Sequence, residues 1–385
     1  MERQAFRTLI PEGWLIQALS DNQITEPTEV QRRALPVVFR GQSVIIQAQT
    51  GSGKTLVFGL PLLAHIRCSV LPPQITVGIV LTPTRELALQ IAQVLRSICP
   101  DVAPVSSIGG VEFRMQSKAL RKDARIVVGT PGRVADLIRQ GIIRLDDVSF
   151  FALDEADEML SIGFLEEVEA ILECVPKGAQ GIFTSATITP RVMMLASRFL
   201  KRPEQVCVEA QALGKGDVEH YCCRVTAGLI DKARRVMDVI EKVNPRSTII
   251  FCNTKSDTEF VEAVLKRNGV VAERLNSDLT QVQRASLMTR LKDQSLRVVV
   301  ATDLAARGID VDQIDLVINY SLPDSAETYV HRTGRTGRAG RSGVAATILP
   351  PMDIPRLHLM QKVLNVAFRE YEDLGASETQ VSKVS

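Results

Sequence analysis

Short apolar runs rich in β-branched residues alternate with helical patterns along most of the chain. In the first half these runs predict strands at residues 44–47, 77–82, 105–108, 125–129, 150–154 and 181–184, with helices between them, for example over 86–98 and 133–139. In the second half they predict strands at residues 248–251, 270–274, 298–301, 316–319 and 345–349. Strands this apolar, separated by helices, predict an α/β fold with mainly parallel sheets covered by helices on both faces.

A polar, glycine-containing stretch near residue 210 interrupts this alternation. A chain of 385 residues is also too long for one ordinary hydrophobic core. The pattern therefore predicts an N-terminal domain over residues 1–209, a linker over 210–217, a C-terminal domain over 218–368 and a short polar tail over 369–385.

Composition narrows the class of protein. Hydrophobic residues make up 45% of the chain and charged residues 23%, as in globular proteins, and the net charge is only +2. Any nucleic-acid surface must therefore be a local patch. The seven cysteines form no C-x-x-C pair, which favours reduced thiols over a zinc site.

The chain shows no clear membrane or targeting segment. No apolar run approaches the roughly 18 residues of a membrane span, so we expect no membrane partner. The N-terminus shows neither a secretory nor a transit pattern. We expect a cytoplasmic monomer, with an organelle as the alternative if a leader has been removed.

One glycine-rich loop follows the apolar run at residues 44–46. It reads Ala48-Gln-Thr-Gly-Ser-Gly-Lys-Thr55 and fits the relaxed form of the G-x-x-x-x-G-K-[ST] phosphate loop. Glycines let the backbone turn its N–H groups inward, and the following helix adds the positive end of its dipole. We predict that Lys54 contacts the β- and γ-phosphates of a nucleoside triphosphate and that Thr55 holds Mg²⁺.

Two acids stand where the apolar strand before Asp154 ends. In a parallel sheet this is the edge that also carries the phosphate loop. Asp154 is therefore predicted to hold Mg²⁺ and Glu155 to orient the water that attacks the γ-phosphate. An acidic strand-to-helix cap is the plainer alternative, and the phosphate loop in the same domain favours catalysis.

The run Asp154-Glu-Ala-Asp157 and the motifs around it resemble the DEAD-box RNA helicases. The shared motifs include Pro27-Thr28-Glu-Val-Gln31, Pro83-Thr-Arg-Glu-Leu-Ala88, Gly109-Gly110, Thr130-Pro-Gly-Arg133, Ser185-Ala-Thr187, Ile250-Phe-Cys-Asn-Thr254, Gln281-x-x-Arg284, Ala301-Thr-Asp-Leu-Ala-Ala-Arg-Gly-Ile-Asp310 and His331-Arg-Thr-Gly-Arg-Thr-Gly-Arg338. Single motifs of this kind occur by chance, but this many in family order do not. The resemblance implies two tandem RecA-like domains.

The resemblance also implies an ATP site shared by both domains. Gln31 would read the adenine edge with Phe6 stacking on the base, although Thr28 and Gln31 alone would indicate only a helix cap. Arg335 and Arg338 would reach the transferring phosphoryl group as arginine fingers, so hydrolysis would require domain closure. The implied nucleotide contacts are Phe6, Gln31, Ala48, Gln49, Thr50, Gly51, Ser52, Gly53, Lys54, Thr55, Gly308 and Asp310.

RNA is the implied partner. Small hydroxyls, glycines and a few arginines suit phosphate and ribose contact, so little base preference is expected. The implied RNA contacts are Thr84, Arg85, Gly109, Gly110, Thr130, Gly132, Arg133, Asn253, Thr254, Arg284, Thr302 and Asp303. Asp157, Ser185, Thr187 and His331 would couple hydrolysis to closure, although a strand-end Ser/Thr pair that satisfies local backbone is the alternative.

The implied activity is RNA-stimulated ATP hydrolysis coupled to local unwinding of short duplexes or remodelling of RNA–protein complexes. Protein cofactors that modulate domain closure would be further partners. Two alternatives stay open: an ATP-gated RNA clamp with little unwinding, and a DNA helicase, which usually carries additional domains.

Overall fold

The structure is a computed structural model that describes residues 5–48, 51–68, 71–102, 104–208, 218–226, 228–276, 279, 281–306, 314–337, 342–364 and 366–373. Contacts within the chain separate two units, Met1–Ala210 (unit 1) and Gln211–Ser385 (unit 2). The predicted linker at residues 210–217 lies outside the described residues.

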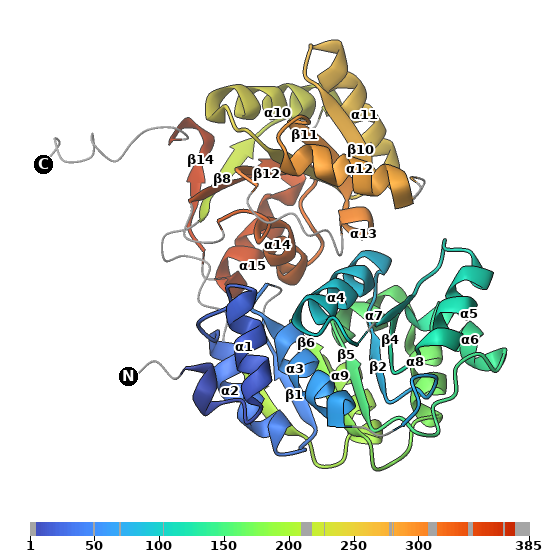
Figure 1. Cartoon of the computed structure of the whole chain (residues 1–385). Helices are drawn as coiled ribbons and strands as arrows, with labels where there is room; N and C mark the ends of the chain where they lie inside the picture. The colour runs from blue at the N-terminus through green and yellow to red at the C-terminus, as the bar shows by residue number, and fades with distance from the viewer. Residues whose placement is uncertain are drawn as a thin grey trace, which may run out of the picture. The chain divides into compact units, whose positions relative to one another are not determined.

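Unit 1 is built on one parallel sheet (Figure 1). Its strands are β1 (Val44–Gln47), β2 (Gly78–Leu81), β3 (Val105–Ser107), β4 (Ile126–Gly129), β5 (Phe150–Leu153), β6 (Gln180–Ser185) and β7 (Glu204–Cys207). Its helices are η1 (Phe6–Thr8), α1 (Gly13–Asp21), α2 (Glu29–Phe39), α3 (Lys54–Cys68), α4 (Arg85–Ile98), α5 (Phe113–Lys122), α6 (Pro131–Arg139), α7 (Ala156–Ile162), α8 (Leu165–Glu173) and α9 (Pro190–Phe199). The strand order across the sheet is β3-β4-β2-β5-β6-β1-β7.

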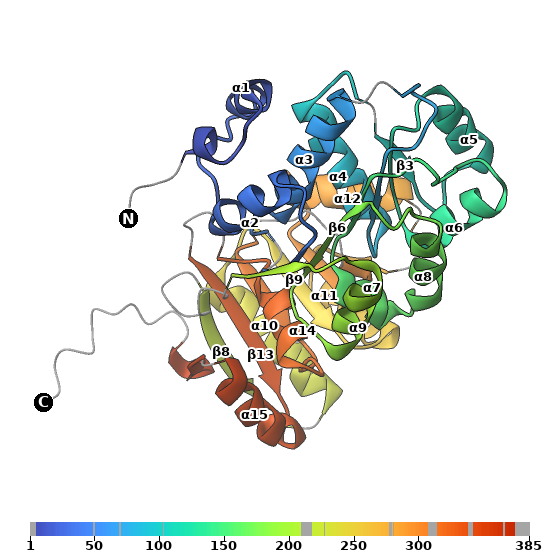
Figure 2. The same ribbon diagram turned by 90° about the horizontal axis from the view of Figure 1, so that it is seen from below.

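Unit 2 has a second parallel sheet (Figure 2). Its strands are β8 (Val218–Arg224), β9 (Thr248–Cys252), β10 (Ala272–Leu275), β11 (Val298–Thr302), β12 (Leu316–Asn319), β13 (Gly343–Leu349) and β14 (Phe368–Glu370). Its helices are α10 (Leu229–Val243), α11 (Lys255–Arg267), α12 (Gln281–Lys292), α13 (Asp303–Ala306), α14 (Ala326–Thr333), η2 (Pro351–Asp353), α15 (Ile354–Leu364) and η3 (Tyr371–Asp373). The strand order is β10-β11-β9-β12-β13-β8-β14.

The two sheets share one topology. Replacing β1 to β7 by β8 to β14 in sequence converts the order of the first sheet into that of the second. The chain therefore repeats one doubly wound plan twice, and the predicted fold class is confirmed.

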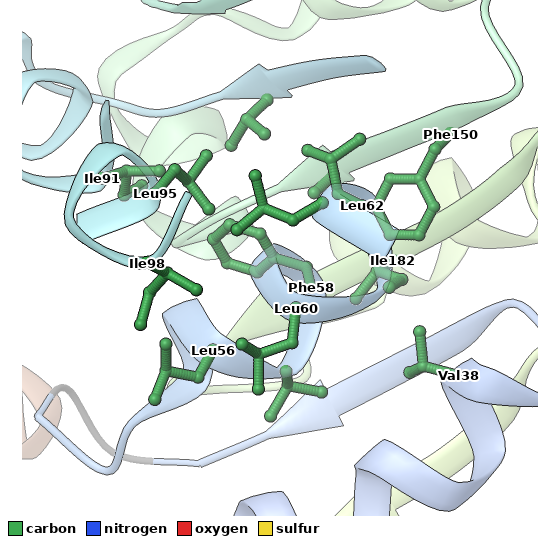
Figure 3. Packing of buried hydrophobic residues seen from close by; sticks show 14 of the residues in the cluster. Val38, Leu56, Phe58, Leu60, Leu62, Ile91, Leu95, Ile98, Phe150 and Ile182 are labelled. Atoms are coloured by element: carbon green, nitrogen blue, oxygen red, sulfur yellow. The ribbon is translucent and has the colours of Figure 1, made fainter. Parts of the chain in front are cut away.

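Alternating side chains on each strand build a core on both faces of a sheet. In unit 1, Val44 and Ile46 pack with α1 to α4, whereas Ile45 between them packs with α5 to α9. Figure 3 shows the first of these cores, where Phe58 and Leu60 of α3 lie beside Ile182 of β6. Because both faces are buried, the strands read as continuous apolar runs.

Three strands were not predicted. β7 and β14 lie at sheet edges with mainly exposed or half-buried side chains, and β8 interleaves polar residues with apolar ones. The predicted tail also begins too early. β14 pairs with β8, and the Tyr371 ring packs on the core of unit 2, because these residues complete the sheet edge.

Candidate functional site

The phosphate loop lies between β1 and α3. Gly51 and Gly53 adopt positive φ angles of 81° and 90°, which turn the backbone toward the start of α3. The Lys54 side chain is buried, and its Nζ donates to the main-chain oxygen of Ala48 at 2.5 Å. Lys54 thus folds over the loop and places its positive charge there. Gln49 and Thr50 lie outside the described residues.

Asp154 stands two strands away on the same sheet edge. β6 pairs with β1 on one side and with β5 on the other, so the carboxyl ends of all three strands meet. The Thr184 hydroxyl donates to Asp154 Oδ1 in the interior. Burial raises the pKa of Asp154, and the nearby Lys54 ammonium opposes that shift. A buried carboxylate and the half-buried Thr55 hydroxyl are hard oxygen donors, and this chemistry fits Mg²⁺.

Glu155 has an unusual backbone. It occupies the left-handed region, with φ 55° and ψ 54°, directly before α7. Its N–H donates to Thr184 Oγ1 at 3.4 Å. Residues other than glycine are uncommon in this region, and such strained residues cluster at functional sites. The tertiary structure therefore sets the direction in which the backbone turns at Glu155 between β5 and α7.

Asp157, Ser185 and Thr187 form one hydrogen-bonded group in unit 1. Asp157 Oδ2 accepts from the Thr187 N–H at 2.9 Å and from the Thr187 hydroxyl at 2.8 Å. The Asp157 N–H donates to Ser185 Oγ at 3.3 Å, and the Ser185 hydroxyl donates to the Thr187 carbonyl at 2.7 Å. Three of the four predicted coupling residues are thus in contact. These bonds also satisfy the local backbone, as the plainer alternative expected.

Gln31 is buried and bonded to the phosphate loop. Its Nε2 donates to the Gly53 carbonyl at 3.0 Å, and its Oε1 accepts from the Thr28 N–H at 2.9 Å. Thr28 and Gln31 also form a capping box, so the plain helix-cap alternative is correct for the local structure. Each amide atom retains capacity for a second hydrogen bond. Phe6 is a core residue at 4% exposure, and its stacking on a base stays a prediction.

The predicted RNA contacts of unit 1 lie on the other half of the same sheet edge. β3, β4 and β2 are neighbours, and they end just before Gly109, Thr130 and Thr84 respectively. The Arg85 guanidinium lies against the Gly109-Gly110 turn, where an added Cβ would stand 2.8 Å and 2.5 Å from its nitrogens. Side chains at this turn would therefore displace Arg85.

Arg133 connects two of these segments. Its Nη1 donates to the Val111 carbonyl at 3.2 Å and to Gln116 Oε1 at 2.9 Å. Gln116 is buried, and its Nε2 donates to the Ile108 carbonyl at 2.6 Å. Gly132 is different, since an added Cβ would meet no atom within 4 Å. Protein packing does not require that glycine, which leaves open space beside the start of α6.

Arg332 organises the corresponding edge of unit 2. It is 1% exposed, and its Nε and Nη2 each donate to the Asp303 carboxylate at 2.6 Å. Nη2 also donates to Asn253 Oδ1 at 2.8 Å. Nη1 donates to Asn319 Oδ1 at 3.2 Å and to the Ser321 carbonyl at 2.7 Å. Arg332 therefore holds two predicted RNA contacts, Asp303 and Asn253, in one network.

The other predicted residues of unit 2 are spread along its described elements. Thr254 caps α11 by accepting from the Asp257 N–H at 3.0 Å, and Arg284 Nη2 donates to the Ala305 carbonyl at 2.6 Å. Thr302 ends β11, His331 lies in α14, and Arg335 follows that helix. Gly308, Asp310 and Arg338 lie outside the described residues.

The topological counterpart of the phosphate loop in unit 2 is the turn between β8 and α10. Its sequence, Val225-Thr-Ala-Gly228, contains no Gly-Lys-Thr. Asp231 stands in the first turn of α10 and accepts from the Thr226 hydroxyl. A carboxylate at this position occupies the positive end of the helix dipole, which disfavours a bound phosphate. Of the two repeats, only unit 1 carries the phosphate-loop sequence.

Three structural residues were missed from the sequence. Thr184 bonds both Asp154 and the Glu155 N–H, Gln116 joins two segments, and Arg332 organises unit 2. Thr184 had one available signal, since it is a polar residue at the end of an apolar strand. Arg332 stands inside the motif His331–Arg338 but was assigned no role, and Gln116 had no signal, because its partners are distant in sequence.

Comparison with known proteins identifies the family. A family model for DEAD/DEAH box helicases matches residues 28–195, and one for the helicase conserved C-terminal domain matches residues 231–340. The chain is similar to a crystal structure of a DEAD box protein from Methanococcus jannaschii, with 32% identity, a TM-score of 0.54, and coverage of 96% of this chain and 99% of that one. This chain belongs to the DEAD-box family.

Other DEAD-box relatives carry informative names. The ATP-dependent RNA helicase DeaD of Haemophilus influenzae is 39% identical over 92% of this chain, which spans only 58% of that relative. The structure of S. cerevisiae Dbp5 bound to RNA and ADP BeF3 is 27% identical, covers 95% of each chain and has a TM-score of 0.83. Within the described residues of this DEAD-box chain, no helix is long and apolar enough to cross a membrane.

Proposed function

We propose that the chain is an RNA-stimulated ATPase that binds RNA backbone with both units and locally unwinds short duplexes or remodels RNA–protein complexes. One observation carries the proposal. In unit 1 a single sheet edge holds the phosphate loop after β1, the acids after β5, the Ser185 and Thr187 hydroxyls at the end of β6, and the predicted RNA contacts after β2, β3 and β4. Ligands of doubly wound sheets bind at this edge. Membership of the family supports ATP and RNA as those ligands.

In this proposal the residues of unit 1 bind the nucleotide and Mg²⁺ and orient the attacking water. Lys54 contacts the β- and γ-phosphates, and Thr55 and Asp154 hold Mg²⁺, which supplies positive charge near the phosphates when bound. Glu155 orients the attacking water. Gln31 selects adenine, and its bond to the Gly53 carbonyl would link base recognition to the loop.

Residues of unit 2 complete the proposed cycle. Arg335 and Arg338 neutralise charge on the transferring phosphoryl group, and Gly308 and Asp310 contact the nucleotide. His331 meets the group formed by Asp157, Ser185 and Thr187. ATP and RNA together favour the closed arrangement, and hydrolysis then releases the RNA. Protein partners would act by shifting closure, and the active form is a monomer.

Glu155→Gln tests the chemistry. The amide retains the size of the side chain but loses the charge that orients water. ATP turnover is expected to fall at least about 10²-fold, the scale of lost general-base catalysis, while ATP and RNA affinities stay near wild type. Glu166→Gln, on the exposed start of α8, is the matched control. Unchanged turnover in Glu155→Gln would remove Glu155 from the mechanism.

A strand-displacement assay on a short RNA duplex tests the mechanical step. ATP-dependent displacement supports the helicase. ATP-dependent binding without displacement would identify a clamp instead, and a wild-type ATPase that DNA stimulates as well as RNA does would contradict the assignment of RNA.

A further inference from the structure

Helix α5 carries an exposed row of positive charge. Arg114, Lys118, Arg121 and Lys122, here called the basic stripe, are all exposed on this ten-residue helix. No carboxylate occurs within α5. Among the residues that the structure describes, the side chain of none of the four forms a hydrogen bond or ion pair. In a chain of net charge +2 this is a concentrated local excess.

The stripe follows one face of the helix. Its members recur at intervals of four, three and one residues, so they project from adjoining positions on the solvent side. Gln116, Ser117 and Leu120 are the buried residues on the other side. Other exposed arginines of unit 1 form ion pairs, unlike those of the stripe. Arg139 and Arg144 each pair with a nearby aspartate. The unpaired stripe is therefore available for an external anion.

Its place in the fold adjoins the proposed RNA edge. α5 begins at Phe113, shortly after the Gly109-Gly110 turn. Gln116 ties α5 to that turn through the Ile108 carbonyl, and to α6 through Arg133. Figures 1 and 2 both show α5 next to α6. The hydrogen bonds of the buried Gln116 thus hold α5 beside two predicted RNA-contacting segments.

We propose that the basic stripe binds the phosphate backbone of the RNA duplex that flanks the strand held at the sheet edge. The inference rests on the proposed function and extends it to a substrate: a duplex with a single-stranded tail. From Arg114 to Lys122 the helix advances about 12 Å at ~1.5 Å per residue, so the stripe presents about one charge per 3–4 Å. Phosphates along one strand follow at ~3.4 Å, so the stripe can track the backbone of one strand of a duplex. The predicted RNA contacts at the sheet edge hold the single strand, and the stripe lies beside that edge, where the flanking duplex would continue.

Neutralising the stripe tests this assignment. The variant Arg114→Gln/Lys118→Gln/Arg121→Gln keeps good helix formers on α5. Its matched control, Lys177→Gln/Lys201→Gln/Arg202→Gln, removes the same charge from exposed sites at the amino ends of β6 and β7. Affinity is measured for a short single strand and for a duplex carrying that strand as a tail, across a series of salt concentrations.

The stripe variant is expected to bind the tailed duplex at least about tenfold more weakly at low salt, with a salt slope smaller by about 1 per lost phosphate contact and by up to about 3 in total. Binding of the single strand, RNA-saturated ATP turnover and melting temperature should match the control. Equal duplex affinity and salt slope in the two variants would overturn the stripe assignment. An absence of RNA stimulation in the wild type would instead overturn the proposed function.

Discussion

Removing the Arg332 side chain should unfold unit 2 far more easily than removing a similar arginine at its surface. Arg332 is 1% exposed and ties together Asp303, Asn253, Asn319 and the Ser321 carbonyl. Arg332→Met keeps the length of the side chain but leaves the Asp303 carboxylate without its partner. Arg332 is buried but the Asp303 side chain is 28% exposed, so breaking this pair should cost about 3 kcal/mol of unfolding free energy, the lower end of the range for buried ion pairs. For a unit of this size the melting temperature should fall by about 6–12 °C, at roughly 2–4 °C per kcal/mol.

The measurement is urea unfolding followed by far-ultraviolet circular dichroism. The single tryptophan, Trp14, lies in unit 1, so its fluorescence reports on the unaltered unit as an internal reference. Arg356→Met is the control, because the Arg356 side chain is 40% exposed, lies 3.5 Å and 3.4 Å from Asp324 and Asp353, and donates one hydrogen bond to the Leu322 carbonyl at 2.9 Å. Its substitution should cost no more than about 1 kcal/mol.

A double variant separates the cost of the lost hydrogen bonds from the cost of leaving the Asp303 carboxylate unpaired. Arg332→Met/Asp303→Asn should recover part of the loss, since no unpaired carboxylate is left. Asn253 would also lose its anchor, so the RNA concentration that half-saturates ATP turnover should rise in Arg332→Met. If Arg332→Met unfolds within about 1 kcal/mol of Arg356→Met, the reasoning about the buried network is wrong.

The other predictions concern the nucleotide site and pH. Gln31→Ala should weaken ATP binding and reduce the preference for ATP over GTP, measured by competition; an unchanged preference would remove Gln31 from base recognition. Burial lowers the pKa of His220 to about 4, against about 6.5 when unfolded, so stability present above pH 6.5 is lost as pH falls toward 4. At pH 5 the loss is about 2 kcal/mol, which unfolding curves at pH 7 and pH 5 would detect. His220→Phe should flatten that dependence, and an equal slope in both proteins would contradict the role of His220.

The central strands can be located from the sequence because both of their faces are buried. β1 and β12 match their predicted bounds, since burial on both faces leaves an uninterrupted apolar run. β14 carries little such signal because it lies at a sheet edge, with no buried residue among its three. The start of the tail was placed too early for the same reason.

The candidate site also has a part that the sequence predicts and a part that it does not. The phosphate loop and the Asp154 run were found from the sequence because their function depends on residue types at fixed short spacing. The bonds from Thr184 to Asp154 and from Gln116 to Arg133 join residues far apart in the chain, and spacing carries no information about them.

By itself the sequence determined the two doubly wound units, the phosphate loop in the first of them, and the motifs that place the chain in its family. These features follow from local chemistry: apolar runs make strands, glycines permit positive φ angles, and fixed spacings carry motifs. Only the tertiary structure decided that Glu155 takes a left-handed backbone, that Arg332 is a buried anchor, and that α5 presents unpaired charge beside the proposed RNA edge. Those outcomes depend on which side chains the folded sheets bring together, and hydrogen bonds and burial between distant residues are set only when the chain has folded.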